Sequence, residues 1–134
     1  MPSSLITLQS NYSPQETMSR LVAAVEAHRM SALARIDHAA AAHAAGLELR
    51  PTEVLVFGNP RAGTPLMQAV QAIGIDLPLK ALVWQDAAET TWLSYNDPRF
   101  PAQRHGVAGA DVVLTAMTAA LAAVSSEATG TAVP

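Results

Sequence analysis

The alternation of apolar and polar positions predicts five short strands along the chain. Each is a run of apolar or alternating residues bounded by turn-forming residues, which is typical of a buried or half-buried strand. The runs occupy residues 5–8, 32–37, 52–57, 80–84 and 91–95. A short polar loop separates the last two runs, which favours a hairpin and a mostly antiparallel or mixed sheet of about four to five strands.

Helical periodicity between these runs predicts helices that pack on the sheet. One helix is expected from Ser13 to about Met30, because Ser13, Pro14 and Glu16 form a capping box with proline at the first helical position. A last helix is expected after Asp111. The apolar stripes of these two helices are Met18, Leu21, Val22 and Val25, and Val113, Leu114, Met117, Leu121 and Val124. The pattern therefore predicts a two-layer α+β fold.

The loop that follows the third run is a candidate binding site. Thr64 followed by Pro65 predicts a helix N-cap with proline at the first helical position. Such a helix end carries unpaired backbone N–H groups and a partial positive charge, and Arg61 adds a full charge nearby, so an anion would be stabilised there. The alternative is that the glycine and proline residues only shape a tight strand-to-helix connection.

Lys80 is predicted to be the only charged residue on one face of the hairpin. If Gln85 pairs with Thr90, Lys80 shares its face with Leu82 and Trp84 of its own run and with Thr91, Leu93 and Tyr95 of the returning run. An ammonium group among apolar side chains must find a partner or lose its proton. Lys80 would then pair with a carboxylate such as Asp37, hold an anion, or act as a nucleophile. The alternative is a lysine that reaches solvent from the start of the strand.

Asp37 and His38 lie where the second run meets an alanine-rich helical segment, residues 39–45. Asp37 fits the N-cap of that segment, and His38 can titrate near neutral pH inside a pocket. His38 and His43 are five residues apart and point to different faces of a helix, whereas metal-binding histidines on a helix are usually three or four apart. We therefore expect no metal site and no cofactor.

Length and composition limit the possible classes of protein. The chain of 134 residues fits one domain, expected over residues 1–124, followed by a small polar tail at 125–134 that we expect to be disordered. It has no cysteine, which excludes disulfides, thiolate nucleophiles and zinc–thiolate sites. Its net charge of −3, with scattered basic residues, argues against nucleic-acid binding.

The chain also lacks the usual signals for export or membrane insertion. We find no basic stretch followed by a long apolar run at the N-terminus and no segment that reaches transmembrane length, so we expect a cytoplasmic protein without a membrane partner. Half of the residues are hydrophobic (50%) and only 14% are charged, which is apolar for a small monomer. A subunit interface would cover part of that surface, and we expect a homodimer.

Several motifs occur together in the middle of the chain: Phe57-Gly58-Asn59-Pro60, Gly63-Thr64-Pro65-Leu66-Met67, Gly74-Ile75-Asp76-Leu77-Pro78-Leu79-Lys80, Val83-Trp84 and Tyr95-Asn96-Asp97-Pro98. In combination they resemble the bacterial family called domain of unknown function 302, over roughly residues 13 to 124. The resemblance implies a small α+β domain with helices packed on a sheet, usually met as a homodimer. It implies no established activity and no cofactor.

The leading hypothesis is a small homodimer that binds a compact anionic molecule at the strand-to-helix loop. The expected ligand-binding residues are Asn59, Arg61, Gly63, Thr64, Lys80 and Asn96. Backbone amides of Gly63 and Thr64 would hold the anion, the two cations would balance its charge, and an asparagine would orient it. This hypothesis requires Thr64 and Lys80 to share one cavity.

Three other hypotheses remain open. The first is an enzyme in which Lys80 acts as a base or Schiff-base nucleophile while Asp37 or His38 passes protons. The second is haem or metal binding by His38, His43 or His105, which the spacing of the histidines supports weakly. The third is an interaction module whose apolar surplus is all interface.

Overall fold

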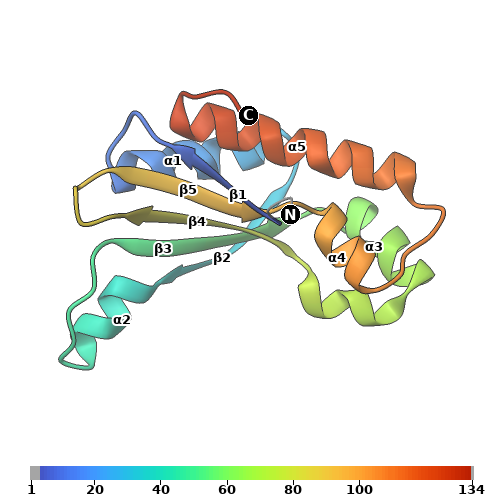
Figure 1. Cartoon of the computed structure of the whole chain (residues 1–134), viewed down its shortest axis with the longest axis horizontal. Coiled ribbons are helices and arrows are strands. Elements are labelled where there is room, and N and C mark those ends of the chain that lie inside the picture. The colour runs from blue at the N-terminus through green and yellow to red at the C-terminus, as the bar shows by residue number, and fades with distance from the viewer. Residues whose placement is uncertain (1–3, 134) are drawn as a thin grey trace.

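A computed structural model describes residues 4–133 of the chain as a sheet with two long helices on one face and shorter helices at its two ends (Figure 1). The strands are β1 (Leu5–Gln9), β2 (Ser31–Asp37), β3 (Thr52–Gly58), β4 (Leu79–Gln85) and β5 (Thr91–Asn96). The helices are α1 (Pro14–Ala27), α2 (His38–Ala44), α3 (Pro60–Ala69), the 3-10 helix η1 (Gln71–Asp76), α4 (Arg99–Arg104) and α5 (Asp111–Thr129).

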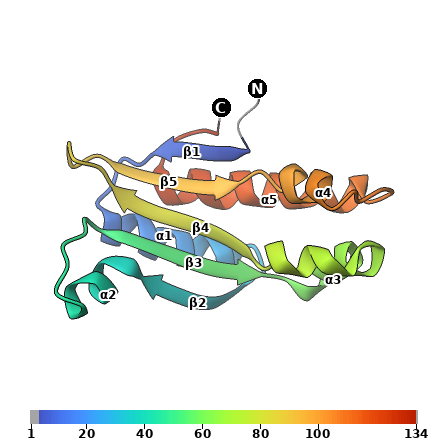
Figure 2. The ribbon, with the colours of Figure 1, turned by 60° about the horizontal axis from the view of Figure 1, so that its bottom comes forward.

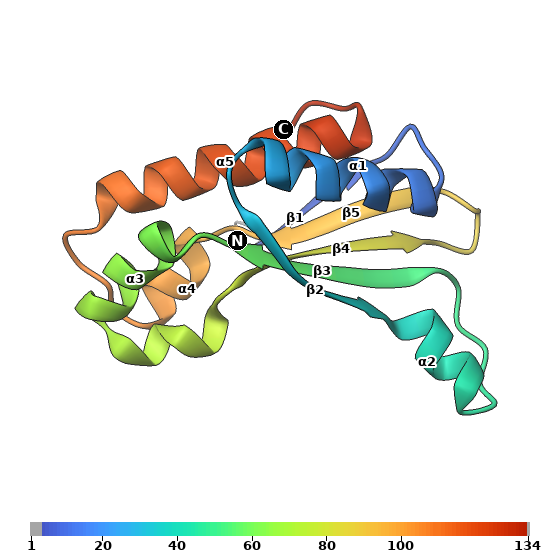
Figure 3. The same ribbon diagram turned by 180° about the vertical axis from the view of Figure 1, so that it is seen from behind.

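The five strands form one sheet in the order β1-β5-β4-β3-β2, and every neighbouring pair is antiparallel. Helices α1 and α5 lie side by side on one face of this sheet (Figures 1 and 3). The other face, which α1 and α5 do not cover, is called the open face below and is turned toward the viewer in Figure 2. The predicted two-layer α+β fold is therefore confirmed.

The core lies between the sheet and the two long helices. Hydrophobic burial stabilises this layer because each strand presents every second side chain to the helices. The largest fully buried apolar side chains are Met18, Leu21, Val25, Leu55, Phe57, Leu66, Ile73, Val83, Leu93, Leu121 and Val124. They come from strands β3, β4 and β5 and from helices α1, α3, η1 and α5, so the core joins both ends of the chain.

The two helix N-caps predicted in the N-terminal half of the chain, Ser13 and Asp37, are confirmed. The Ser13 hydroxyl accepts a hydrogen bond from the backbone N–H of Glu16 at 3.1 Å, and α1 ends at Ala27, three residues before the expected end. Asp37 caps α2, since its carboxylate accepts a hydrogen bond from the backbone N–H of Ala40 at 2.9 Å. Both side chains satisfy helix-end donors that have no partner within the helix.

The predicted register of the β4–β5 hairpin is wrong by one residue. Gln85 pairs with Thr91 rather than Thr90, so Trp84 stands opposite Trp92. Because side chains alternate along a strand, a shift of one residue reverses the face of every residue in β5 relative to β4. Lys80 therefore lies on the open face and is exposed, while Leu93 points into the helix-covered core.

The predicted disordered tail is wrong for residues 125–129, which form the last turns of α5. Ser125 and Thr129 are fully buried, and the backbone N–H of Asn11 donates to the carbonyl oxygen of Thr129 at 2.9 Å. Beyond the helix, the Thr131 hydroxyl donates to the carbonyl oxygen of Gln9 at 3.0 Å. Small side chains in this segment suit close helix packing. The last expected tail residue, Pro134, lies outside the described residues.

Helix α5 also corrects the prediction that no segment reaches transmembrane length. It has 19 residues with a mean hydropathy of 1.4, which is long and apolar enough to cross a membrane by length and composition alone. Core helices of globular proteins pass the same test, and 33% of this segment is buried against the rest of the domain. Its buried residues include Met117, Leu121 and Val124, which belong to the core.

Because α5 packs on the sheet with one side only, we expect two substitutions by alanine on this helix to lower the free energy of unfolding by different amounts. Leu121 is 1% exposed, and Leu121→Ala should lower the free energy of unfolding by about 2–5 kcal/mol because it leaves a cavity in the core. Val112 is 84% exposed, and Val112→Ala should change stability by no more than about 0.5 kcal/mol. Urea denaturation of both variants measures this, and equal effects would contradict the packing of α5.

Candidate functional site

The strand-to-helix loop has a different geometry from the one that the sequence predicts. Helix α3 begins at Pro60, five residues before the expected first helical residue Pro65, and its N-cap is Asn59. The side-chain oxygen of Asn59 accepts a hydrogen bond from the backbone N–H of Arg61 at 2.9 Å. Thr64 and Pro65 lie inside the helix. Asn59-Pro60 and Thr64-Pro65 both have the sequence of an N-cap followed by proline. The helix starts at the first of these because β3 ends directly before it, at Gly58.

This geometry removes the amide cradle expected for an anion. The carbonyl oxygen of Asn59 accepts hydrogen bonds from the backbone N–H groups of Ala62 at 2.9 Å and Gly63 at 3.1 Å. Thr64 follows in the helix, where backbone amides donate to carbonyl oxygens one turn earlier. The Arg61 side chain is exposed, and Arg61 does not line the neighbouring cavity. The loop therefore directs neither unpaired amides of these residues nor the Arg61 side chain into the cavity.

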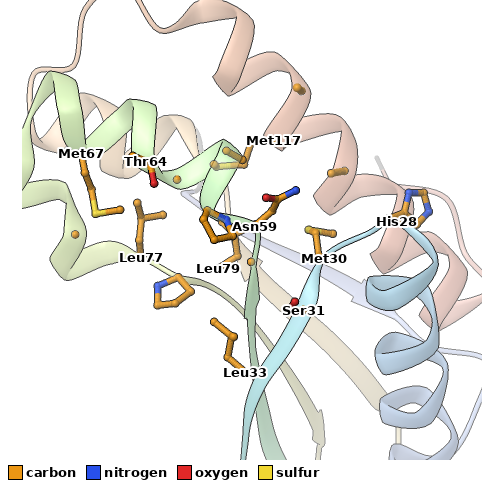
Figure 4. A pocket seen from close by; sticks show the side chains of 18 residues that line it. His28, Met30, Ser31, Leu33, Asn59, Thr64, Met67, Leu77, Leu79 and Met117 are labelled. Atoms are coloured by element: carbon orange, nitrogen blue, oxygen red, sulfur yellow. The ribbon is translucent and has the colours of Figure 1, made fainter.

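A cavity of about 610 Å³ lies beside this loop, at the end of the sheet where β2 begins and β3 ends (Figure 4). Helix α3, η1 and the middle of α5 complete its walls. Its larger apolar lining residues are Met30, Leu33, Met67, Leu77, Leu79 and Met117. Glycines and alanines of the same helices make up much of the rest, so the lining is mostly apolar.

Four polar side chains line the same cavity: His28, Ser31, Asn59 and Thr64. In Figure 4 the amide of Asn59 lies between Met117 and Met30, and Thr64 hangs from α3. The imidazole of His28 is 2.6 Å from a carboxylate oxygen of Glu127, so this pair ties the end of α1 to α5 beside the cavity. The cavity therefore combines an apolar body with a few hydrogen-bonding groups.

The structure divides the predicted ligand-binding residues between two places. Asn59, Gly63 and Thr64 line the cavity at the loop. Lys80 and Asn96 line a separate hollow of about 370 Å³ on the open face. The expectation that Thr64 and Lys80 share one cavity is therefore wrong. The physical reason is strand alternation, since Leu79 lines the cavity and the next side chain points to the opposite face.

Asp37 and His38 lie apart from Lys80. Asp37 is opposite Glu53 on the helix-covered face and caps α2, so the expected ion pair between Asp37 and Lys80 is not made. Glu53 instead binds Arg35 through two hydrogen bonds, of 3.0 and 3.1 Å, and this contact raises the pKa of the arginine. The proton relay expected among these residues therefore does not form around Lys80.

Within residues 4–133, no group of three or more histidine and carboxylate side chains is placed to hold a metal ion. The short contacts made by histidines are single pairs with a carboxylate. One is the His28–Glu127 pair, and the other is a 2.6 Å contact between His105 and Asp76. Arg104 binds the same carboxylate at 3.2 Å. This second pair joins the end of α4 to η1, which explains His105 by packing of the two segments.

Sequence reasoning missed the methionine and leucine side chains that make the cavity. Met117 belongs to the predicted apolar stripe of the last helix, and the motifs that contain Met67 and Leu77 assign neither residue a role. A residue that lines a cavity and one that fills a core follow the same apolar periodicity. No signal in the linear pattern separates the two.

The helix start at Asn59 predicts which loop residue stabilises the fold. Asn59→Ala should lower the free energy of unfolding by about 1 kcal/mol, because the N–H of Arg61 loses its cap. Asn59→Asp should retain stability, since a carboxylate also caps and complements the helix dipole. Thr64→Ala, the matched control, should change stability by at most about 0.5 kcal/mol. Urea denaturation in which Thr64→Ala costs more than Asn59→Ala would contradict this helix start.

Comparison with solved structures supports the fold. The chain resembles the crystal structure of an uncharacterized conserved protein DUF302 from Bacillus stearothermophilus, with a TM-score of 0.86 at 19% sequence identity. The likeness covers 95% of this chain and 99% of that one. At this level of identity the comparison establishes a shared fold.

Curated relatives share more sequence. The chain is 43% identical over 129 residues to a protein named fluoride-specific ion channel FluC 1 from Brucella suis biovar 1 (strain 1330) and to its namesake from Brucella abortus biovar 1 (strain 9-941). The match covers 96% of this chain but only 51% and 48% of those proteins. The chain thus spans about half the length of the curated relatives that it matches.

A comparison with protein families covers most of the domain. The sequence pattern described as domain of unknown function DUF302 matches residues 6–124, from β1 to the buried part of α5. This range includes the loop, the cavity lining and the whole sheet except the first residue of β1. The chain therefore belongs to the DUF302 family.

Proposed function

We propose that this chain binds a small, mostly apolar molecule with one hydrogen-bonding group in the cavity beside α3. The observation that carries the proposal is the lining itself, in which three methionines and three leucines surround four polar side chains. A volume of about 610 Å³ is within the range of small-molecule sites, which are usually apolar with a few placed polar groups.

The methionines support a ligand of irregular shape. Met30, Met67 and Met117 come from three different segments and converge on the cavity (Figure 4). Unbranched, polarizable methionine side chains adapt to a bound molecule at little cost. Asn59 and Thr64 would then orient the ligand through hydrogen bonds, because polar groups in such a site fix direction more than they add affinity.

This proposal replaces the compact anion that the sequence favours. A small anion needs cations or free N–H donors, and the amide of Gly63 is already bonded to Asn59. Neither Arg61 nor Lys80 lines the cavity. The names of the relatives mention fluoride, but for the same reason we do not propose that this site binds it. A lysine-dependent reaction here also lacks support, because Lys80 faces the other side of the sheet.

A cavity-filling substitution tests the proposal. Gly63 lies in α3 facing Leu77 and Met67, and a side chain at this position would begin 3.7 Å from Leu77. Gly63→Leu should therefore occupy the cavity and lower the affinity for the neutral apolar dye N-phenyl-1-naphthylamine at least tenfold. Dye fluorescence measures the affinity, and thermal unfolding should show no loss of stability because leucine favours helix more than glycine does.

Ala69→Leu is the matched control. Ala69 is the last residue of the same helix and is exposed outside the cavity, so this variant adds the same side chain without filling the site. Its affinity for the dye should stay within twofold of the unsubstituted chain. If both leucine variants bind the dye equally well, the cavity is not the binding site.

We further propose that two copies associate through β2 and the segment that follows it. Strand β2 is at the edge of the sheet, and all seven of its residues are exposed. Four of the eight exposed large apolar side chains in the described part of the chain occur here, at Leu33, Ile36, Leu47 and Leu49. An edge strand with free hydrogen-bonding groups and apolar side chains is a template for another strand.

The sequence of β2 is suited to pairing with itself. Antiparallel pairing of residues 35–37, at the end of β2, about a two-fold axis through Ile36 would set Arg35 opposite Asp37 of the partner subunit, and the reverse, on one face of the joined sheet. The other face would bring the two Ile36 side chains together. Such a self-complementary patch is what a two-fold interface requires. This arrangement gives the expected homodimer a specific surface.

One charge at the proposed two-fold axis, at Ile36, tests the interface. Ile36→Glu should convert a dimer to a monomer, because two carboxylates would meet at the axis. Val112→Glu, on the most exposed apolar residue of α5, should leave the dimer intact. Native mass spectrometry and light scattering report the subunit number. A dimer that survives Ile36→Glu would place the interface elsewhere, and a monomeric unsubstituted chain would exclude the homodimer.

A further inference from the structure

The open face of the sheet carries a single charged side chain among the strand residues that point to it. Pairing places Lys80 opposite Val56, and Leu82 between Val54 and Ser94. The next pair along the hairpin is Trp84 and Trp92. The remaining residues of this face follow from the same registers and are Leu5, Thr7, Gln9, Ser31, Ala34, Ile36, Thr52, Gly58 and Asn96. All are uncharged.

Part of this face is hollowed into a groove over β4, the central strand of the sheet, whose course Figure 2 shows. Lys80 and Asn96 lie at one end of the groove, each one position beyond the pair formed by Ala81 and Tyr95. Leu82 and Val54 line its middle, and Trp84 lines the other end. The charged group that lines the groove is therefore at one end only.

The tryptophan end of the groove is held in place by hydrogen bonds. The indole N–H of Trp84 donates to the Ser94 hydroxyl at 3.0 Å, and the indole N–H of Trp92 donates to the Asp86 carboxylate at 2.8 Å. The second contact lowers the pKa of Asp86. The two rings stack with centroids 6.1 Å apart. Both indole N–H groups are thus bonded within the protein, and the Trp84 ring presents apolar surface to the groove.

Lys80 has no carboxylate partner in the described part of the chain. The ion pairs found there are made by arginines and histidines, at Arg20, His28, Arg35, Arg99, Arg104 and His105. None of the residues that line the groove is acidic. A lone ammonium beside an amide, at the end of an apolar groove, is complementary to one negative charge on an apolar body.

We propose that this groove binds an unbranched apolar molecule that ends in a carboxylate. The carboxylate accepts hydrogen bonds from the Lys80 ammonium and the Asn96 amide, while the hydrocarbon chain lies on Leu82 and reaches the Trp84 ring. The distance from Lys80 to Trp84 is four residues, about 13 Å along the strand, which suits a chain of medium length. One ammonium matches a singly charged carboxylate, whereas phosphate groups are bound by several donors or by arginine.

Two other roles for this face make different predictions. A second copy of the face would bring two lysines together and supply no carboxylate, so charge complementarity disfavours it. A lysine on an apolar sheet surface can also serve only to prevent aggregation. In that case Lys80 would not distinguish a carboxylate from an alcohol of the same length.

The chain carries its own reporters for this site. Both of its tryptophans, Trp84 and Trp92, lie on the open face, and Lys80 is its only lysine. Tryptophan fluorescence therefore responds to this groove. Reductive methylation with carbon-13 formaldehyde labels Lys80 and the N-terminal amine, and Lys80→Arg identifies the lysine signal by its loss.

The experiment titrates the full chain with octanoate and with octan-1-ol. Octanoate should change tryptophan fluorescence saturably and shift the labelled Lys80 signal, and octan-1-ol should bind at least tenfold more weakly. Lys80→Gln should reduce the affinity for octanoate to that for octan-1-ol, and Lys80→Arg should retain it within threefold. Arg61→Gln, an exposed cation elsewhere, should change nothing.

Each contrary result overturns the proposal. Equal binding of octanoate and octan-1-ol, or octanoate binding that Lys80→Gln leaves unchanged, would assign Lys80 a protective role only. Loss of the octanoate response in Gly63→Leu would place octanoate in the cavity beside α3 instead. If Lys80→Gln self-associates, Asn96→Leu provides the same test, since it should weaken octanoate at least threefold and leave octan-1-ol unaffected.

Discussion

The hydrogen-bond register between β4 and β5 decides which side chains of these two strands share the face that packs against the helices. With Gln85 opposite Thr91, the side chains of Val83 and Leu93 enter the core beneath α1 and α5. The alternate residues, Lys80 among them, are then committed to the open face, because neighbouring side chains on a strand cannot share a side. Because the alternate side chains fill the core, Lys80 lies on the exposed face, where its ammonium group keeps its contact with water.

The cavity beside α3 depends on the same sheet but on a different end of it. Strand β3 passes directly into a helix capped by Asn59, and that helix continues beyond the last strand pairs (Figure 1). Helix α5 is longer than the strands and reaches over this extension, so the two helices meet with side chains between them and no sheet beneath. The site therefore lies where the layered packing ends, and both its apolar lining and its few polar groups follow from that position.

Membership of the DUF302 family and the likeness to the Bacillus stearothermophilus structure show how little of the sequence the fold requires. At 19% identity, the backbone still agrees with a TM-score of 0.86. Side chains that point into the core have to remain apolar and of suitable size, but cores accept many apolar substitutions. The polar side chains of the cavity and the side chains on the open face are not part of this core, which makes them the informative positions for function.

The sequence by itself determined the five strands, the α+β class and the helix caps at Ser13 and Asp37, because these depend on neighbouring residues within one turn or one strand. Only the tertiary structure decided the register of the hairpin, the choice of Asn59 over Thr64 as a helix start, and the length of α5. Each of these alternatives has the same local signal, and the difference in free energy comes from contacts between distant segments. Thr64 and Lys80 were separated by such contacts, through a single step along β4 that moves a side chain across the sheet.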